Sequence, residues 1–96
     1  MTKHMDVLNE IAGILKERFD IPTDNFTGEG LMSNFFGYRY QMGYCDLLYL
    51  VKILEEKFIV CFNDEDYDNA DFYCLNGIAK IIANKTVKTN ERVELP

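Results

Sequence analysis

The side chains of this sequence that could act as nucleophiles are few and far apart. There is one serine, Ser33, and one histidine, His4. Triad-type catalysis needs a nucleophile, a base and an orienting group within hydrogen-bond reach of one another, and these two residues show no such pattern. His4 lies near the N-terminus and is expected at the surface. The sequence therefore predicts no catalytic residue, and an enzyme is the least favoured class.

Three cysteines could form disulfides, ligate a metal or carry a thioester. They lie at Cys45, Cys61 and Cys74. Their odd number and wide spacing fit neither a disulfide framework nor the paired spacing of a zinc site. We expect reduced thiols with mostly structural roles, and no cofactor.

Residues 63–71 are dense in carboxylates, a composition that raises the question of calcium binding. Alternating acids lie at Asp64, Asp66 and Asp68. A calcium loop of the EF-hand kind also needs a glycine at its sixth position and a bidentate glutamate at its twelfth. Counted from Asp64, those positions hold Asn69 and Leu75. We favour a solvated acidic loop with at most one helical turn and no metal site. Weak, nonspecific binding of divalent ions is the alternative.

Length and charge limit the class of protein. The chain has 96 residues, 48% of them hydrophobic, and a formal net charge of −6. This length suits one domain, which we place at residues 1–85, followed by a flexible tail at 86–96. The negative charge makes nucleic acid and anionic membranes poor partners. No stretch has the length of a membrane span, and the N-terminal segment is acidic where a signal peptide would be apolar. We expect a cytoplasmic protein.

Apolar periodicity predicts the helices that position these side chains. Residues 4–19 carry apolar residues at the three- and four-residue spacing of one helical face, and Pro22 ends that segment. A second helix is predicted over 44–58, with Gly43 as its N-cap and Asp46 near the positive end of its dipole. Its buried face comprises Leu47, Leu50, Val51, Leu54 and Phe58. A last helix follows over 75–85, and the tail is expected to be frayed or to form a late strand.

The connection over residues 26–43 is long for a compact domain and rich in aromatic residues. These are Phe26, Phe35, Phe36, Tyr38 and Tyr40. We expect the aromatic side chains to pack this loop onto the core, with a short helical turn near residues 31–35.

The order of helix, long loop, helix, acidic loop and last helix resembles the acyl carrier proteins, as do the strings RFDIPTDNFT, LLYLVKILEEKF, FNDEDY and LNGIAKII. The resemblance implies an all-α, acyl carrier-like bundle of three main helices and one short helix. In that family a serine at the start of the second helix carries phosphopantetheine. Here the attachment triplet aligns with Gly43, Tyr44 and Cys45, so the serine position holds Tyr44.

Outward positions of the second helix also depart from the family, where acids face partner enzymes. Tyr49 and Ile53 lie there instead, and the helix start and end are similar to carrier-related proteins of bacterial peptide-maturation, bacteriocin-type systems. We therefore predict a non-enzymatic docking module for modifying enzymes. Its contact residues would be Tyr44, Asp46, Leu48, Tyr49, Ile53 and Glu56.

Two alternatives stay open for this helix. Leu48, Tyr49 and Ile53 could simply be covered by the loop and the neighbouring helices. The protein could also be a true carrier that holds cargo on Ser33 or as a thioester on Cys45, since the start of a helix can favour a thiolate.

Overall fold

The computed structural model describes the backbone of residues 3–94 and the side chains of residues 4–86. Its α-helices are α1 (Lys3–Phe19), α2 (Tyr44–Phe58), α3 (Asp64–Asp68) and α4 (Leu75–Glu94). Three 3₁₀ turns, η1 (Thr23–Phe26), η2 (Gly28–Met32) and η3 (Ala70–Tyr73), join them. Over residues 3–94 the strand-like pairing consists of one isolated bridge, between Asn34 and Cys74. These elements confirm the predicted all-α class with three longer helices and one short helix.

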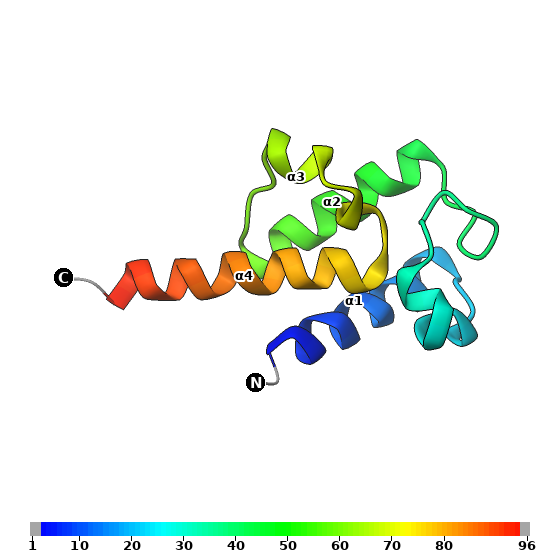
Figure 1. Cartoon of the computed structure of the whole chain (residues 1–96), viewed down its shortest axis with the longest axis horizontal. Coiled ribbons are helices and arrows are strands. Elements are labelled where there is room, and N and C mark those ends of the chain that lie inside the picture. Colours follow the sequence, from blue (N-terminus) through cyan, green and yellow to red (C-terminus); the bar gives the residue numbers. More distant parts are fainter. Residues whose placement is uncertain (1–2, 95–96) are drawn as a thin grey trace.

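Helix α1 packs along the first half of α4, while the second half of α4 reaches beyond the other helices (Figure 1). The predicted apolar face is confirmed for Leu8, Ile11 and Leu15, which are buried. The helix ends where Asp20 adopts a left-handed conformation with φ of 61°. The N–H of Ile21 then donates to the carbonyl of Leu15 at 3.2 Å, which closes the last turn.

Helix α2 has the predicted boundaries because both of its ends are capped locally. At its start, the N–H of Gly43 donates to Oδ2 of Asp46 at 2.9 Å, so the carboxylate satisfies an N-terminal donor. At its end, Ile59 is left-handed with φ of 55°. The N–H of Val60 returns to the carbonyl of Glu55 at 3.2 Å. The predicted buried face holds for Leu47, Leu50, Val51 and Leu54, and Phe58 is half-buried.

The long loop packs onto the core through two of its aromatic residues. Phe35 is fully buried, and its ring meets Tyr40 edge-on with centroids 5.2 Å apart. The Tyr40 hydroxyl proton is shared between the carbonyls of Asn25 and Gly30, each 2.9 Å away. Burial, with a smaller effect from nearby Cys74 and against the opposing charge of Arg39, raises the pKa of Tyr40 to about 12.

The remaining loop predictions are only partly correct. Phe26 is half-buried, whereas Phe36 and Tyr38 are exposed. The helical turn lies at Gly28–Met32, slightly before the predicted position, and Thr23–Phe26 forms a second turn that was not predicted. The loop is fastened to the rest of the chain by the Phe35 N–H, which donates to the carbonyl of Tyr73 at 2.7 Å.

Helix α4 supplies the centre of the core. The largest fully buried side chains of the molecule are Phe35, Phe72, Ile11, Leu15, Leu50, Leu54, Leu75, Ile78 and Ile82. The thiol of Cys74 accepts a hydrogen bond from the Gly77 N–H at 3.4 Å and so caps the first turn. Gly77 approaches the backbone of Asp71 so closely that a Cβ would collide with its carbonyl.

Residues 86–94 of the predicted C-terminal tail are helical in their backbone, since α4 continues through Glu94. The suggestion of a late strand is therefore wrong. The division of the chain at residue 85 into a domain and a flexible tail stays a prediction, because the side chains from residue 87 onward lie outside the described set. None of the helices over residues 3–94 combines the length and the apolarity needed to cross a membrane.

Candidate docking surface

Helix α2 turns its buried face toward the core and exposes the rest of its first half. Tyr44, Leu48 and Tyr49 are exposed to 69%, 46% and 48% respectively. Ile53 is half-buried. The alternative in which loop and helices cover this helix fails for Leu48 and Tyr49 and holds in part for Ile53.

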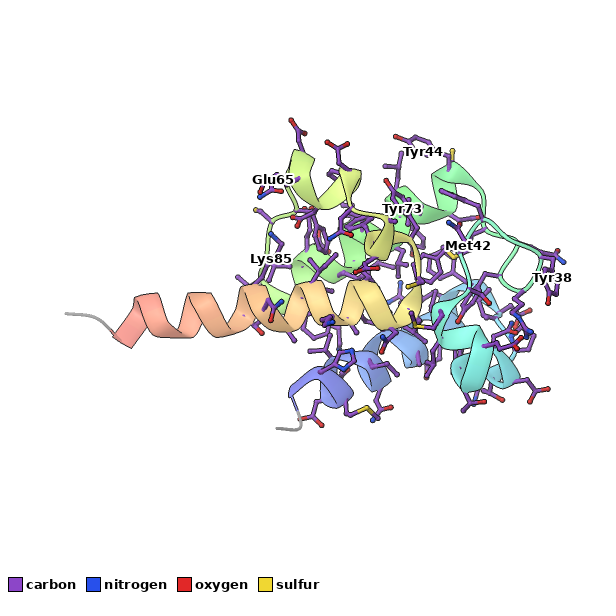
Figure 2. All side chains as sticks on the ribbon, in the orientation of Figure 1. Tyr38, Met42, Tyr44, Glu65, Tyr73 and Lys85 are labelled. Atoms are coloured by element: carbon purple, nitrogen blue, oxygen red, sulfur yellow. The ribbon has the colours of Figure 1, made fainter. Side chains whose placement is uncertain are left out.

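These four side chains lie on two sides of α2. Tyr44 and Leu48 are one helical turn apart and share one side, while Tyr49 and Ile53, also one turn apart, share the other. Tyr44 of the first pair lies on the side of Tyr67 and η3 (Figure 2), and the second pair lies on the side of α1. The single contact surface predicted from the sequence is therefore two surfaces with the outward ridge of α2 between them.

The side toward η3 is built from aromatic residues of four segments, namely the long loop, α2, α3 and η3. Figure 2 shows Tyr44 on α2 and Tyr73 on η3 on this side of the molecule. The ring of Phe36 packs on Tyr73 with centroids 5.9 Å apart, and the Tyr73 hydroxyl donates to the carbonyl of Tyr67 at 2.6 Å. We refer to this set as the aromatic surface; its members are Phe36, Tyr44, Leu48, Tyr67 and Tyr73.

Neighbouring carboxylates and phenols affect the ionisation of Tyr67, a member of the aromatic surface. Partial burial raises the pKa of the Tyr67 hydroxyl, as do the carboxylates of Glu55 and Asp66 and, to a smaller extent, the phenols of Tyr44 and Tyr73. A phenolate would therefore meet two negative groups and lose solvent. The hydroxyl stays protonated and can donate a hydrogen bond to a partner.

The side toward α1 is partly held by contacts within the chain. Nη1 of Arg18 donates to the Tyr49 hydroxyl at 3.1 Å, and the ring of Phe19 meets Tyr49 edge-on with centroids 5.6 Å apart. Ile53 faces Ile14 across a groove of about 400 Å³. Tyr49 and Ile53 are still partly exposed to solvent, so this side of α2 is available to a partner as well.

The two acidic residues of the predicted surface differ in what they do. Asp46 accepts the hydrogen bond that caps α2 and lines a small hollow beside Met42 and Tyr40. Glu56 is exposed and lines the groove next to Ile53. Asp46 is therefore first of all a capping residue, whereas Glu56 is free to meet a partner.

The candidate nucleophiles are not brought together. The Ser33 hydroxyl donates to the carbonyl of Glu29 at 2.9 Å. His4 is half-buried rather than fully exposed as expected, because its Nε2 lies 3.2 Å from the carbonyl of Asn76 on α4. Cys45 is exposed at the second position of α2, and Cys61 is exposed after it, whereas Cys74 is buried and caps α4.

The acidic run 63–71 forms α3 and η3. Asp66 accepts from the N–H of Asn63 at 2.9 Å and pairs with Lys85 Nζ at 2.8 Å. Among the side chains that the structure describes, no three potential metal ligands gather in one place. Asp66 is thus engaged in capping and in an ion pair.

Sequence reasoning missed the members of the aromatic surface that come from outside α2. Tyr67 and Tyr73 lie in the acidic segment and its continuation, where carboxylates dominated the interpretation. Phe36 was expected to pack on the core. The clustering of aromatics at 67, 72 and 73 was the available signal, since such residues in a polar segment need a packing partner. Comparison of the chain with models of known protein families, with curated proteins and with solved structures gives no match.

Proposed function

We propose that this protein is a non-enzymatic docking module that binds modifying enzymes through the aromatic surface on α2. The exposure of Tyr44 at 69% and of Leu48 at 46% carries the proposal. Large apolar side chains exposed side by side are typical of contact sites, and tyrosine is enriched among the residues that dominate binding energy. The three neighbouring aromatic residues, Phe36, Tyr67 and Tyr73, extend the same surface to the long loop, α3 and η3.

The charge of the chain defines the partner further. The net charge of −6 and the carboxylates of Glu55 and Asp66 beside Tyr67 favour a partner with an apolar patch and a basic rim. The proposed partners are enzymes that modify a ribosomal peptide, as the sequence resemblance implies. The proposed ancestry is an acyl carrier-type bundle that has lost its phosphopantetheine arm, supported by the element order and by Tyr44 at the aligned serine position.

A binding measurement with the enzymes encoded beside the gene tests this function. Tyr44→Ala and Leu48→Ala should each weaken binding by about tenfold or more, as truncation of central contact residues does. Tyr38→Ala is the matched control, because Tyr38 is 78% exposed and lies at the outer tip of the loop, away from Tyr44 (Figure 2). If folded Tyr44→Ala and Leu48→Ala proteins bind as the original does, the aromatic surface is not the contact site.

A second candidate is a carrier that holds an acyl group on Cys45. Its support is the exposed position of this thiol at the second residue of α2. The Cys45 sulfur would attack the thioester of an acyl-coenzyme A, forming a new thioester and releasing the coenzyme A thiol. Ser33, the other attachment candidate, already donates its hydroxyl hydrogen bond to Glu29.

Intact-mass measurement separates the two functions. The protein is incubated with acyl-coenzyme A, and separately with coenzyme A and a promiscuous phosphopantetheinyl transferase. The docking function predicts no mass gain. A gain that Cys45→Ser abolishes would establish the carrier function on Cys45, and one that Ser33→Ala abolishes would establish it on Ser33.

A further inference from the structure

A second surface lies on the opposite side of α2 from the aromatic surface. It consists of two adjoining hollows of about 610 Å³ and 400 Å³ between α1 and α2, which share Ile14, Glu17 and Lys57. Ile14 and Ile53 are half-buried at its apolar part. Asp6, Gly13 and Glu56 also line these hollows. We call this surface the acidic groove and define it by six residues: Asp6, Gly13, Ile14, Glu17, Ile53 and Glu56.

Gly13 lies in the acidic groove, in the interior of α1. Glycine in a helix interior destabilises the helix relative to alanine because it loses more backbone freedom on folding. At Gly30 and Gly77 close packing against the backbone excludes a side chain, but a Cβ at Gly13 would meet nothing within 4 Å. The fold therefore does not need this glycine. A partner that approaches the backbone of α1 closely would need it.

Four carboxylates and two cations line the two hollows, namely Asp6, Glu10, Glu17 and Glu56 against Arg18 and Lys57. Asp6, Glu17 and Glu56 form no ion pair with a side chain that the structure describes. Nζ of Lys57 on α2 forms an ion pair with Oε1 of Glu10 on α1 at 3.1 Å, so these two charges neutralise each other. The groove thus offers an apolar part at Ile14 and Ile53 and an excess of carboxylates, while the charge of Arg18 beside them is hydrogen-bonded to Tyr49.

We propose that the acidic groove binds a basic amphipathic helix of another protein chain. One apolar residue of that helix would lie between Ile14 and Ile53, its backbone would approach α1 at Gly13, and lysines or arginines would pair with Glu17 and Glu56. Amphipathic helices commonly bind in such grooves with their apolar face inward. This inference does not depend on the aromatic surface, which involves none of these residues.

The test uses the whole protein and a designed peptide of about 15 residues, long enough to form a helix on binding. The peptide carries leucines on one face and lysines on the other, and a second peptide has glutamates in place of the lysines. Amide chemical shifts should change at Gly13, Ile14 and Ile53 with the lysine peptide alone, and the affinity should fall with added salt. Three results would overturn the proposal: no change in amide chemical shifts with the lysine peptide, shift changes confined to α3, or equal binding of the two peptides.

Variants separate groove occupation from charge and stability. Gly13→Ala and Gly13→Gln both favour helix, so each should melt at or above the temperature of the original protein. Gly13→Gln should weaken binding by about tenfold, because its long side chain fills the groove, and Gly13→Ala should weaken it less, because only a Cβ is added where the partner backbone approaches. Glu17→Gln with Glu56→Gln should weaken binding as Gly13→Gln does, whereas Glu65→Gln with Asp68→Asn, an equal charge change on α3, should leave binding unchanged. The proposal is refuted if Gly13→Gln binds the peptide as the original protein does. It is also refuted if the chemical shift of Gly13 changes with protein concentration in the absence of peptide, because a second copy of the chain would then occupy the groove.

Discussion

Arg18, near the end of α1, donates a hydrogen bond of 3.1 Å to the hydroxyl of Tyr49 on α2. Tyr49 nevertheless remains 48% exposed. The residue therefore joins two helices and faces solvent at the same time. Tyr49 differs in this respect from Tyr44, whose exposed hydroxyl forms no hydrogen bond to another helix within the described residues.

Tyr49→Phe and Tyr49→Ala separate the two contacts of this ring. Tyr49→Phe removes only the exposed hydrogen bond and should lower the free energy of unfolding by about 0.5 kcal/mol. Tyr49→Ala also removes the edge-on contact with Phe19 and should lower it by about 1.5 kcal/mol. Urea unfolding followed by circular dichroism measures both values. Equal losses in the two variants would mean that the ring contact contributes nothing.

The buried phenol of Tyr40 makes stability depend on alkaline pH. Its pKa is raised to about 12 in the folded protein, from 10.0 for a free side chain. The folded state therefore keeps a proton that the unfolded state loses, and this contribution is complete below pH 10 and is lost as the pH rises toward 12. A shift of this size corresponds to about 3 kcal/mol at most.

Tyr40→Phe tests this dependence, because phenylalanine keeps the ring and has no proton to lose. The variant should be less stable than the original protein at pH 8, by about 1 to 2 kcal/mol, owing to the lost hydrogen bond to two carbonyls. Thermal melts from pH 8 to pH 11.5 should show the difference between the two proteins shrinking. A constant difference across this range would contradict the assignment to Tyr40.

Ile59 ends α2 in a conformation that suits glycine. It is left-handed, with φ of 55°, and 82% exposed, so replacing it sacrifices little buried apolar area. Ile59→Gly should raise the free energy of unfolding by about 1 kcal/mol, because a β-branched residue is strained there. Ile59→Ala is the control and should gain less. A loss of stability in Ile59→Gly would show that the isoleucine side chain has a packing role.

Gly77 should be intolerant of any side chain, in contrast to Gly13. A Cβ at Gly77 would collide with the carbonyl of Asp71, and relieving that collision requires η3 to move away from α4. Gly77→Ala should lower the free energy of unfolding by about 2 kcal/mol. Chemical denaturation of this variant beside Gly13→Ala measures both effects, which are expected to have opposite signs.

Local patterns account for what the sequence predicted correctly. The boundaries of α2 follow from caps within a few residues of each end and from the spacing of its buried leucines. The apolar face of α1 and the start of α4 follow from the same periodicity. The continuation of α4 through Glu94 was missed because residues 86–94 have β-branched and polar residues without a clear period.

The elements that flank each side of the candidate surface depend on contacts between distant segments, which periodicity does not contain. Tyr49 and Leu48 are neighbours in sequence, yet one faces α1 and the other lies on the side of η3. His4 pairs with the carbonyl of Asn76 at 3.2 Å, a contact that no local pattern foretells. Gly13 is the exception, because a glycine within a periodic helix could have been noticed from the sequence alone.

The hydrogen bond from Phe35 to Tyr73 also has a kinetic consequence. It ties the long loop to the segment just before α4, so two parts of the chain that are far apart in sequence must meet before the loop is in place. The helices require only local contacts and can form early, whereas closing this large loop carries an entropic barrier. Docking of the loop should therefore be a late event in folding, and weakening the contact at Phe35 should speed unfolding more than it slows folding.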